Sequence, residues 1–154
     1  MLLTQAVLFV HIVSAIVLLA GVIGGHIIGA VARRAPDLEH RRGAVALGTP
    51  FERMTTVAVP LTIVSGLVTL TLFGYAITDL WVLASGFVNL VIVAIQVLFW
   101  NRIGPQIHDA LARGDDATAV VLMRDPRAVA IGRLEVALAF VIVALMVFRP
   151  GWPG

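Results

Sequence analysis

The chain has 154 residues, of which 60% are hydrophobic and 13% charged, and its mean hydropathy is +1.01. Ordinary soluble domains carry about 25% charged residues, so the composition predicts an integral membrane protein. All 11 basic residues are Arg, and a net charge of +2 is too small for a nucleic-acid-binding surface. The chain has no cysteine, which excludes disulfides, thiolate catalysis and Cys-ligated metal centres.

The charged residues fall in two blocks. Eighteen of the 20 lie within residues 33–53 and 102–135. A charge at the centre of a bilayer costs roughly 2.5–3.5 kcal/mol, so the uncharged stretches are the candidate spans. Helices are predicted at about 3–32, 50–74, 79–101 and 126–148, each long enough to cross about 30 Å of hydrocarbon. We therefore predict an all-α integral membrane protein, a single domain over residues 1–154 built as a four-transmembrane-helix bundle.

Local signals place the helix ends. Thr49-Pro50-Phe51-Glu52 has the form of a capping box with proline at the first helical position, which predicts that the second helix begins there. Asp125-Pro126 predicts the start of the fourth helix, and Pro150 its end. The segment 105–123 mixes apolar and charged residues around Arg113-Gly114-Asp115, which predicts two short surface helices.

The arginines predict the orientation. They fill the two long connections (Arg33, Arg34, Arg41, Arg42 and Arg53; Arg102, Arg113, Arg124, Arg127 and Arg133) and are absent from the short link 74–79. By the positive-inside rule both Arg-rich connections are cytoplasmic, both termini lie outside, and the protein belongs to the inner (cytoplasmic) membrane. Aromatic residues are expected at the membrane surfaces: Tyr75 and Trp81 outside, Trp100 inside, and Trp152 at the C-terminal end.

Two histidines in the first span are candidates for function. His11 and His26 are separated by about 22 Å of helical rise, so they cannot bind the same ion. His11 could be an axial ligand of haem b, with Met146 completing a His/Met pair. The alternative is a core histidine hydrogen-bonded to a neighbour such as Asn89.

A polar cluster is predicted at the inner ends of the helices, around His26. Its members are Glu52, Arg53, Arg102, Arg133 and Glu135. Such a cluster could bind an anionic head group, a haem propionate or a quinone carbonyl, or it could be an ion network that locks the helix ends. No carboxylate is expected at mid-depth in a span, which fits poorly with proton-coupled small multidrug exporters.

Gly21, Gly25 and Gly29 recur at every fourth position of the first span. Small residues at this spacing allow close helix packing, and they could equally leave room for a flat cofactor. The chain has no phosphate-binding glycine loop, no HExxH metal site and no nucleophile elbow, so nothing in it specifies an enzyme.

Two segments carry a family resemblance. Val10-His11-Ile12 with Ala20-Gly21, and the closing 145–150 segment with Arg149 before Pro150, resemble small bacterial membrane proteins of the CopD/HemJ-like group. The Pro-Arg pair of HemJ-type proteins is absent, with Ile27 near its place, and the resemblance is closest to the uncharacterised branch of predicted four-helix proteins. It implies a haem-binding role for His11 and a functional role for Arg149.

Two functions from different classes follow. One is a helix-packing accessory or self-associating subunit of a membrane assembly, a homo-oligomer or part of a larger, possibly respiratory, complex in the lipid bilayer. The other is a haem-b-binding redox membrane protein with His11 as ligand. A copper or lipid transport role is a third, weaker hypothesis.

Overall fold

The computed structural model describes residues 2–150, and within that range the chain is helical with short turns. The elements are α1 (Leu2–Arg34), α2 (Leu38–Phe73), α3 (Leu80–Ile95), the π-helical turn η1 (Gln96–Trp100), α4 (Asn101–Arg113), α5 (Asp116–Arg124) and α6 (Pro126–Phe148). Trp152, predicted as a C-terminal anchor, lies outside the described residues.

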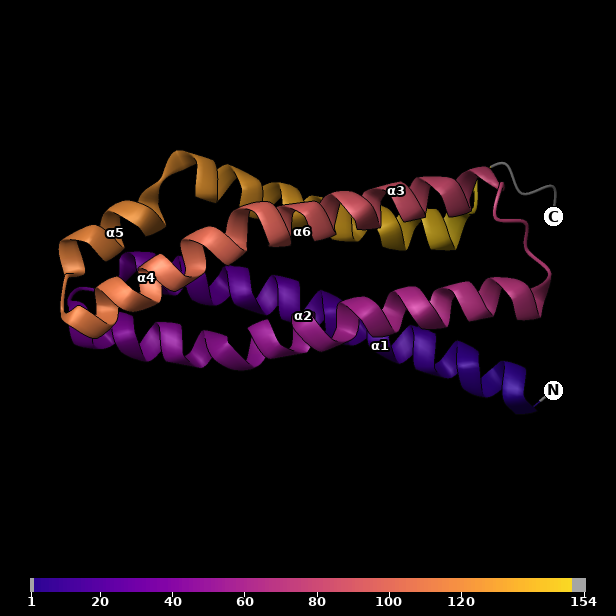
Figure 1. The fold of residues 1–154 in the computed structure, drawn as a ribbon, viewed down its shortest axis with the longest axis horizontal. Coiled ribbons are helices and arrows are strands. Elements are labelled where there is room, and N and C mark those ends of the chain that lie inside the picture. The colour runs from indigo at the N-terminus through magenta and orange to yellow at the C-terminus, as the bar shows by residue number, and fades with distance from the viewer. Residues whose placement is uncertain (1, 151–154) are drawn as a thin grey trace.

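The long helices form two pairs. α1 packs along α2, and α3 packs along α6 (Figure 1). Four helices are long and apolar enough to cross a membrane: α1, α2, the continuous run Leu80–Arg113, and α6. The start of α1 and the end of α6 lie at one end of the bundle, and α4 and α5 lie at the other (Figure 1). The prediction of an all-helical bundle with four candidate spans is confirmed.

The predicted start of the second helix at Pro50 is wrong. α2 begins at Leu38, where the Asp37 carboxylate accepts the backbone N–H of His40 at 2.9 Å and caps the helix. Pro50 and Pro60 both lie inside α2. The early turns of α2 form because Ala44 packs into a small core with α4 and α5, and this tertiary packing outweighs the local capping signal.

The second connection contains two short helices, as the sequence predicts. The helix predicted to end near residue 101 continues without a break through η1 into the first of them, α4. The break around Gly114 is where the sequence places it. Gly114 ends α4 in the left-handed conformation (φ 80°), as Gly74 ends α2 (φ 70°), and Asp115 caps α5. α6 begins at Pro126 with Asp125 as its cap, as predicted.

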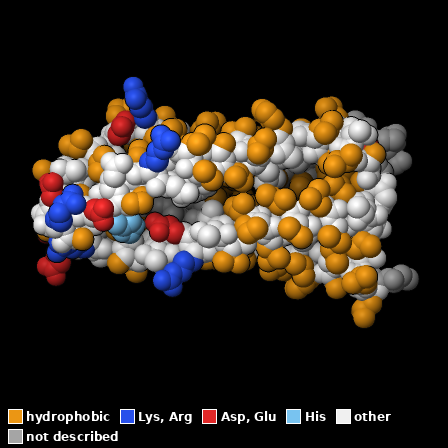
Figure 2. All heavy atoms as spheres, viewed as in Figure 1, with side chains coloured by type: hydrophobic (Ala, Val, Ile, Leu, Met, Phe, Trp, Pro, Cys, Tyr) orange, Lys and Arg blue, Asp and Glu red, His pale blue; other side chains and the backbone are white. Residues whose placement is uncertain are grey.

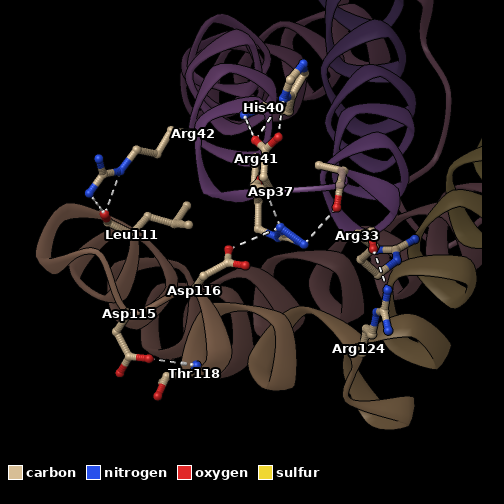
Figure 3. A network of polar contacts seen from close by, with 11 residues as sticks. Arg33, Asp37, His40, Arg41, Arg42, Leu111, Asp115, Asp116, Thr118 and Arg124 are labelled. Carbon is tan, nitrogen blue, oxygen red and sulfur yellow. Dashed lines mark hydrogen bonds and ion pairs between the residues drawn. The ribbon is translucent and has the colours of Figure 1, made fainter.

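Arginine side chains fasten the charged end of the bundle (Figure 3). Arg41 is only 3% exposed, and its guanidinium donates to the carbonyl of Ala35 at 2.9 Å and to the Asp116 carboxylate at 3.1 Å. Arg42 donates to the carbonyl of Leu111. These bonds join the α1–α2 turn to α4 and α5, so two of the connection arginines are structural rather than free surface charges.

The surface divides along the length of the bundle. In Figure 2 charged side chains gather towards one end, and the rest of the drawn face is covered by apolar side chains. Trp81 is 5% exposed and packs edge-to-face on Tyr75. Its expected place at the outer membrane surface stays a prediction.

Candidate functional site

Glu135 is a carboxylate buried inside the bundle. It is 0% exposed and lies nine residues into α6, about 14 Å along a helix of about 35 Å. The sequence places Glu135 at the inner ends of the helices, and in the structure its side chain is enclosed by the bundle. A buried carboxylate is costly unless its oxygens accept hydrogen bonds, so its surroundings decide what it can do.

Three nitrogen atoms surround the Glu135 carboxylate. The side-chain amide of Gln96 donates to Oε1 at 2.5 Å, and the indole N–H of Trp100 donates to Oε2 at 2.8 Å. His26 Nε2 lies 3.2 Å from the same Oε2. The partners come from α1 and η1, so one side chain of α6 connects three helices. None of the three is an arginine, and the imidazole is the only titratable side chain among them.

Gln96 and Trp100 converge because they lie four residues apart on one helical turn. Residues at this spacing share a face in an α-helix, and they still do in the wider π turn. Gln96 and Trp100 are the first and last residues of η1, and both point to Glu135. Single π turns are found frequently at functional sites, and this one aligns two donors on one carboxylate.

The surroundings of Glu135 open into a cavity of about 760 Å³ between the two helix pairs. Its walls are mostly apolar, and they include Gly25 and Gly29 of α1, Val93 of α3 and Val97 of η1. Figure 2 shows the hollow on the drawn face, beside acidic and histidine side chains. Cavities of about 300–1,000 Å³ with apolar walls and a few convergent polar groups are typical of small-molecule sites.

A second carboxylate–imidazole pair lines the same cavity towards the charged end. His108 Nε2 of α4 lies 3.8 Å from Glu52 Oε1 of α2, and both side chains are substantially exposed. Arg33 also lines this part of the cavity. The cavity thus extends from an exposed polar mouth to the buried His26–Glu135 pair.

The predicted inner cluster is brought together only in part. His26 and Glu135 are in contact, and Glu52 lines the same cavity. Arg53, Arg102 and Arg133 are exposed on the surface. Residues two apart on a helix point in nearly opposite directions, which is why Arg133 faces outward where Glu135 faces inward. The ion network predicted among these residues does not form around Glu135.

His11 lies in the other half of α1 and is packed against α2. Its Nδ1 lies 3.1 Å from the carbonyl oxygen of Thr62 and 3.3 Å from Ser65 Oγ. The expected partner Asn89 instead donates to the carbonyl of Ser85 in its own helix. A Cβ at Gly66 would lie 3.0 Å from the His11 ring, so glycine there lets the imidazole fit between the helices.

Arg149 closes the end of the bundle that carries the start of α1. It adopts the left-handed conformation after α6, and its guanidinium donates to Tyr75 Oη at 2.6 Å. The same group lies 5.1 Å from the ring centre of Tyr75 and 5.6 Å from that of Trp81, within the range of cation–π interactions. Met146 is partly buried one turn earlier in α6.

The three glycines of α1 have different surroundings. A Cβ at Gly21 would collide with Thr55 and lie 3.0 Å from the Phe51 carbonyl oxygen, so α1 and α2 approach closely there. A Cβ at Gly25 would meet nothing within 4 Å, and one at Gly29 would meet only the Arg33 side chain of the same helix, at 3.6 Å. Within one chain, Gly21 serves helix packing, and Gly25 and Gly29 leave space in the cavity.

Sequence reasoning missed the roles of Gln96 and Trp100. No role is assigned to Gln96 from the sequence, and Trp100 is placed at the inner membrane surface. The available signal was their spacing of four residues on one span, at the depth of Glu135. The π turn that aligns them has no recognisable pattern in the sequence.

The fold and site define an integral membrane protein of four candidate spans with a buried polar site at an internal cavity. The chain belongs to the family described as "Predicted integral membrane protein (DUF2269)", whose model matches residues 5–150. No curated protein and no solved structure matches the chain. The prediction of an uncharacterised membrane-protein family is confirmed, and its grouping with CopD domains and HemJ-type proteins stays a prediction.

Proposed function

We propose that this protein binds a small amphipathic molecule in the cavity between the α1–α2 and α3–α6 pairs. The observation that carries the proposal is the fully buried Glu135, held by His26, Gln96 and Trp100 at the wall of a cavity of about 760 Å³. A polar group confined at the end of an apolar cavity fixes the orientation of a ligand whose body is apolar.

Two glycines in the cavity wall support the same function. Gly25 and Gly29 line the cavity without adding side chains to it, beside Val22, His26 and Arg33 of the same helix. A purely structural bundle gains van der Waals contact by filling such a space, because association of helices in lipid depends on close packing. The alternative considered from the sequence, that these glycines make room for a flat molecule, agrees with this geometry.

The test compares the small molecules carried by wild-type protein with those carried by a variant whose cavity is filled. The protein is purified in mild detergent, extracted with organic solvent, and its small molecules are quantified per chain by mass spectrometry. A molecule near one per chain is expected with wild-type protein and depleted in Gly25→Leu. Gly86→Leu is the matched control, because a Cβ at Gly86 also meets nothing within 4 Å and Gly86 does not line the cavity. Equal recovery from all three proteins would contradict the proposal.

Haem b bound through His11 is the second candidate. The observation in its favour is the contact of His11 Nδ1 with the Thr62 carbonyl, since metal-binding histidines commonly donate their other ring nitrogen to such a partner. Nε2 of His11 would be the axial ligand, and Met146 is the predicted second ligand.

An absorption spectrum tests the haem candidate. Purified protein, oxidised and then reduced with dithionite, should show a Soret band that His11→Ala abolishes and His40→Ala leaves unchanged, since His40 is exposed near the start of α2. A preparation that stays colourless after haem addition would exclude this candidate. The accessory or self-associating role predicted from the sequence stays a prediction, which a measured oligomeric mass would test.

A further inference from the structure

We infer that the ligand of this cavity is a lipophilic cation, and that its binding displaces the proton held by the His26–Glu135 pair. This inference rests on the proposed function, because it names the chemical class of the molecule bound in the same cavity. It goes beyond the cavity's shape and depends on the charge and hydrogen-bonding capacity of the side chains that line it.

Two carboxylates in the cavity lining favour a cation over a neutral carbonyl compound. The indole N–H of Trp100 and one N–H of the Gln96 amide already donate to Glu135. Arg33 and Asn101 also line the cavity as donors. The groups that attract positive charge are the Glu135 carboxylate in the interior and the Glu52 carboxylate at the mouth. Acceptor oxygens and a carboxylate charge attract a cation.

Trp100 adds a second feature suited to a cation. Its ring lies at the cavity wall with its centre 5.9 Å from that of His26. An indole face is the strongest cation–π partner among the side chains, and the interaction strengthens when both groups are out of water. Trp100 therefore holds the carboxylate through its N–H and contributes its ring to the same cavity.

The charge balance of the site explains the displaced proton. The titratable groups lining the cavity are His26 and Arg33 from α1, Glu52 from α2, His108 from α4 and Glu135 from α6. In the proposed resting state the His26–Glu135 pair shares one titratable proton, on either the carboxyl or the imidazole, and in both cases the pair has no net charge. A cation bound beside Glu135 replaces that proton, because binding without proton release would leave a net positive charge in the buried site.

The Glu52–His108 pair offers a route by which the released proton can leave the cavity. Glu52 and His108 line the mouth of the same cavity, 3.8 Å apart and partly exposed to solvent. A proton released from His26–Glu135 has titratable groups between it and the charged end of the bundle. This arrangement would allow exchange of one cation for one proton at a single buried carboxylate.

The experiment uses full-length protein in detergent and the probe tetraphenylphosphonium, with triphenylphosphine oxide as an uncharged aromatic comparison. Equilibrium dialysis should show saturable tetraphenylphosphonium binding whose Kd rises about tenfold per pH unit on acidification, which corresponds to one proton exchanged. Calorimetry in two buffers of different ionisation enthalpy should count about one proton released per cation. Glu135→Gln should weaken binding at least tenfold and remove the pH dependence.

Controls separate this inference from the proposed function. Glu39→Gln, which removes an exposed carboxylate outside the cavity, should bind like wild type, and Glu135→Asp should retain pH-dependent binding if Glu135→Gln fails to fold. Triphenylphosphine oxide binding as tightly as the cation, and blocked by Gly25→Leu, would overturn the cation inference and keep the cavity. Tetraphenylphosphonium binding that is absent in wild type, or unchanged in Glu135→Gln, would also overturn the inference. Binding of both probes that is unaffected by Gly25→Leu would instead count against the cavity as a binding site.

Discussion

The imidazole of His26 lies directly against Gly132, one turn before Glu135 on α6. A Cβ at Gly132 would lie 3.0 Å from His26 Cε1 and 3.1 Å from Nδ1. The missing side chain at Gly132 therefore provides the space from which His26 reaches the carboxylate at 3.2 Å. α6 thus contributes both the carboxylate and the gap that admits its imidazole partner.

Gly132→Ala should destabilise the protein. Replacing a helical glycine by alanine ordinarily stabilises a helix by about 0.5–1 kcal/mol, but here the new methyl group presses on the His26 ring. We expect the ring to shift from Glu135, with a net loss of about 1–3 kcal/mol from crowding and a weakened buried hydrogen bond. Thermal unfolding in detergent measures the effect.

Two further variants isolate the cause. Gly86→Ala, where the new methyl group meets nothing within 4 Å, should be neutral or stabilising. In the background of His26→Ala, Gly132→Ala should lose most of its cost, because the ring it presses on is absent. A Gly132→Ala protein as stable as Gly86→Ala would show that the contact has no energetic weight.

Gly21 and Gly25 should respond differently to the same substitution. Gly21→Leu places a side chain where a Cβ already lies 3.0 Å from backbone atoms of Phe51 and Thr55, so α1 and α2 must separate. We expect a large fall in melting temperature, equivalent to about 1–3 kcal/mol or more. Gly25→Leu should leave the melting temperature nearly unchanged, because its side chain enters open space. A large fall for Gly25→Leu would mean that Gly25 packs against another copy of the chain.

The sequence predicts the helices and spans of the fold more completely than it predicts the contacts of the site. Spans follow from where charges are absent, and the cost of charge in lipid is large enough to make that signal reliable. Helix starts were predictable where the cap is local, as at Asp125-Pro126, and not at Pro50, where packing of the early turns of α2 decides. The contact of His26 with Glu135 joins residues 109 positions apart, and no local pattern encodes it.

Arg149 should stabilise the packing of Tyr75 and Trp81 at the end of α6. Removing its guanidinium in Arg149→Ala eliminates a charged hydrogen bond to Tyr75 and the cation–π contacts with Tyr75 and Trp81, at a cost of about 1–3 kcal/mol. With Trp100 and Trp152 replaced by Phe, the fluorescence of Trp81 should move to longer wavelength as water reaches the ring. Arg149→Lys keeps the charge and should show a smaller shift. An unchanged spectrum in Arg149→Ala would contradict this role.

The cap of α5 should make that helix sensitive to acid. Hydrogen bonds from the side chain and the backbone amide of Thr118 lower the pKa of the Asp115 carboxyl below its ordinary value. Because the folded pKa is lowered, the carboxylate contributes its stability above the ordinary aspartate pKa and loses it as the pH falls through the folded value. Amide-exchange protection of α5 should therefore fall in that acidic range. Asp115→Asn keeps a capping oxygen and should make the protection of α5 less dependent on pH. If the pH dependence of this protection is the same in Asp115→Asn as in wild type, another titratable group causes it.

The orientation predicted from the arginines can be tested by labelling single cysteines, because the chain has none of its own. Arg41 is unsuitable as a site, since its buried guanidinium fastens the charged end of the bundle. Exposed positions at the two ends are Glu39, beside the α1–α2 turn, and Thr78, in the link before α3. With intact cells, a membrane-impermeant maleimide should label cysteine at 78 and leave cysteine at 39 unlabelled until the membrane is opened, because arginine-rich connections are retained in the cytoplasm. The reverse pattern would invert the protein in the membrane and place the mouth of the cavity, with Glu52 and His108, on the outer side.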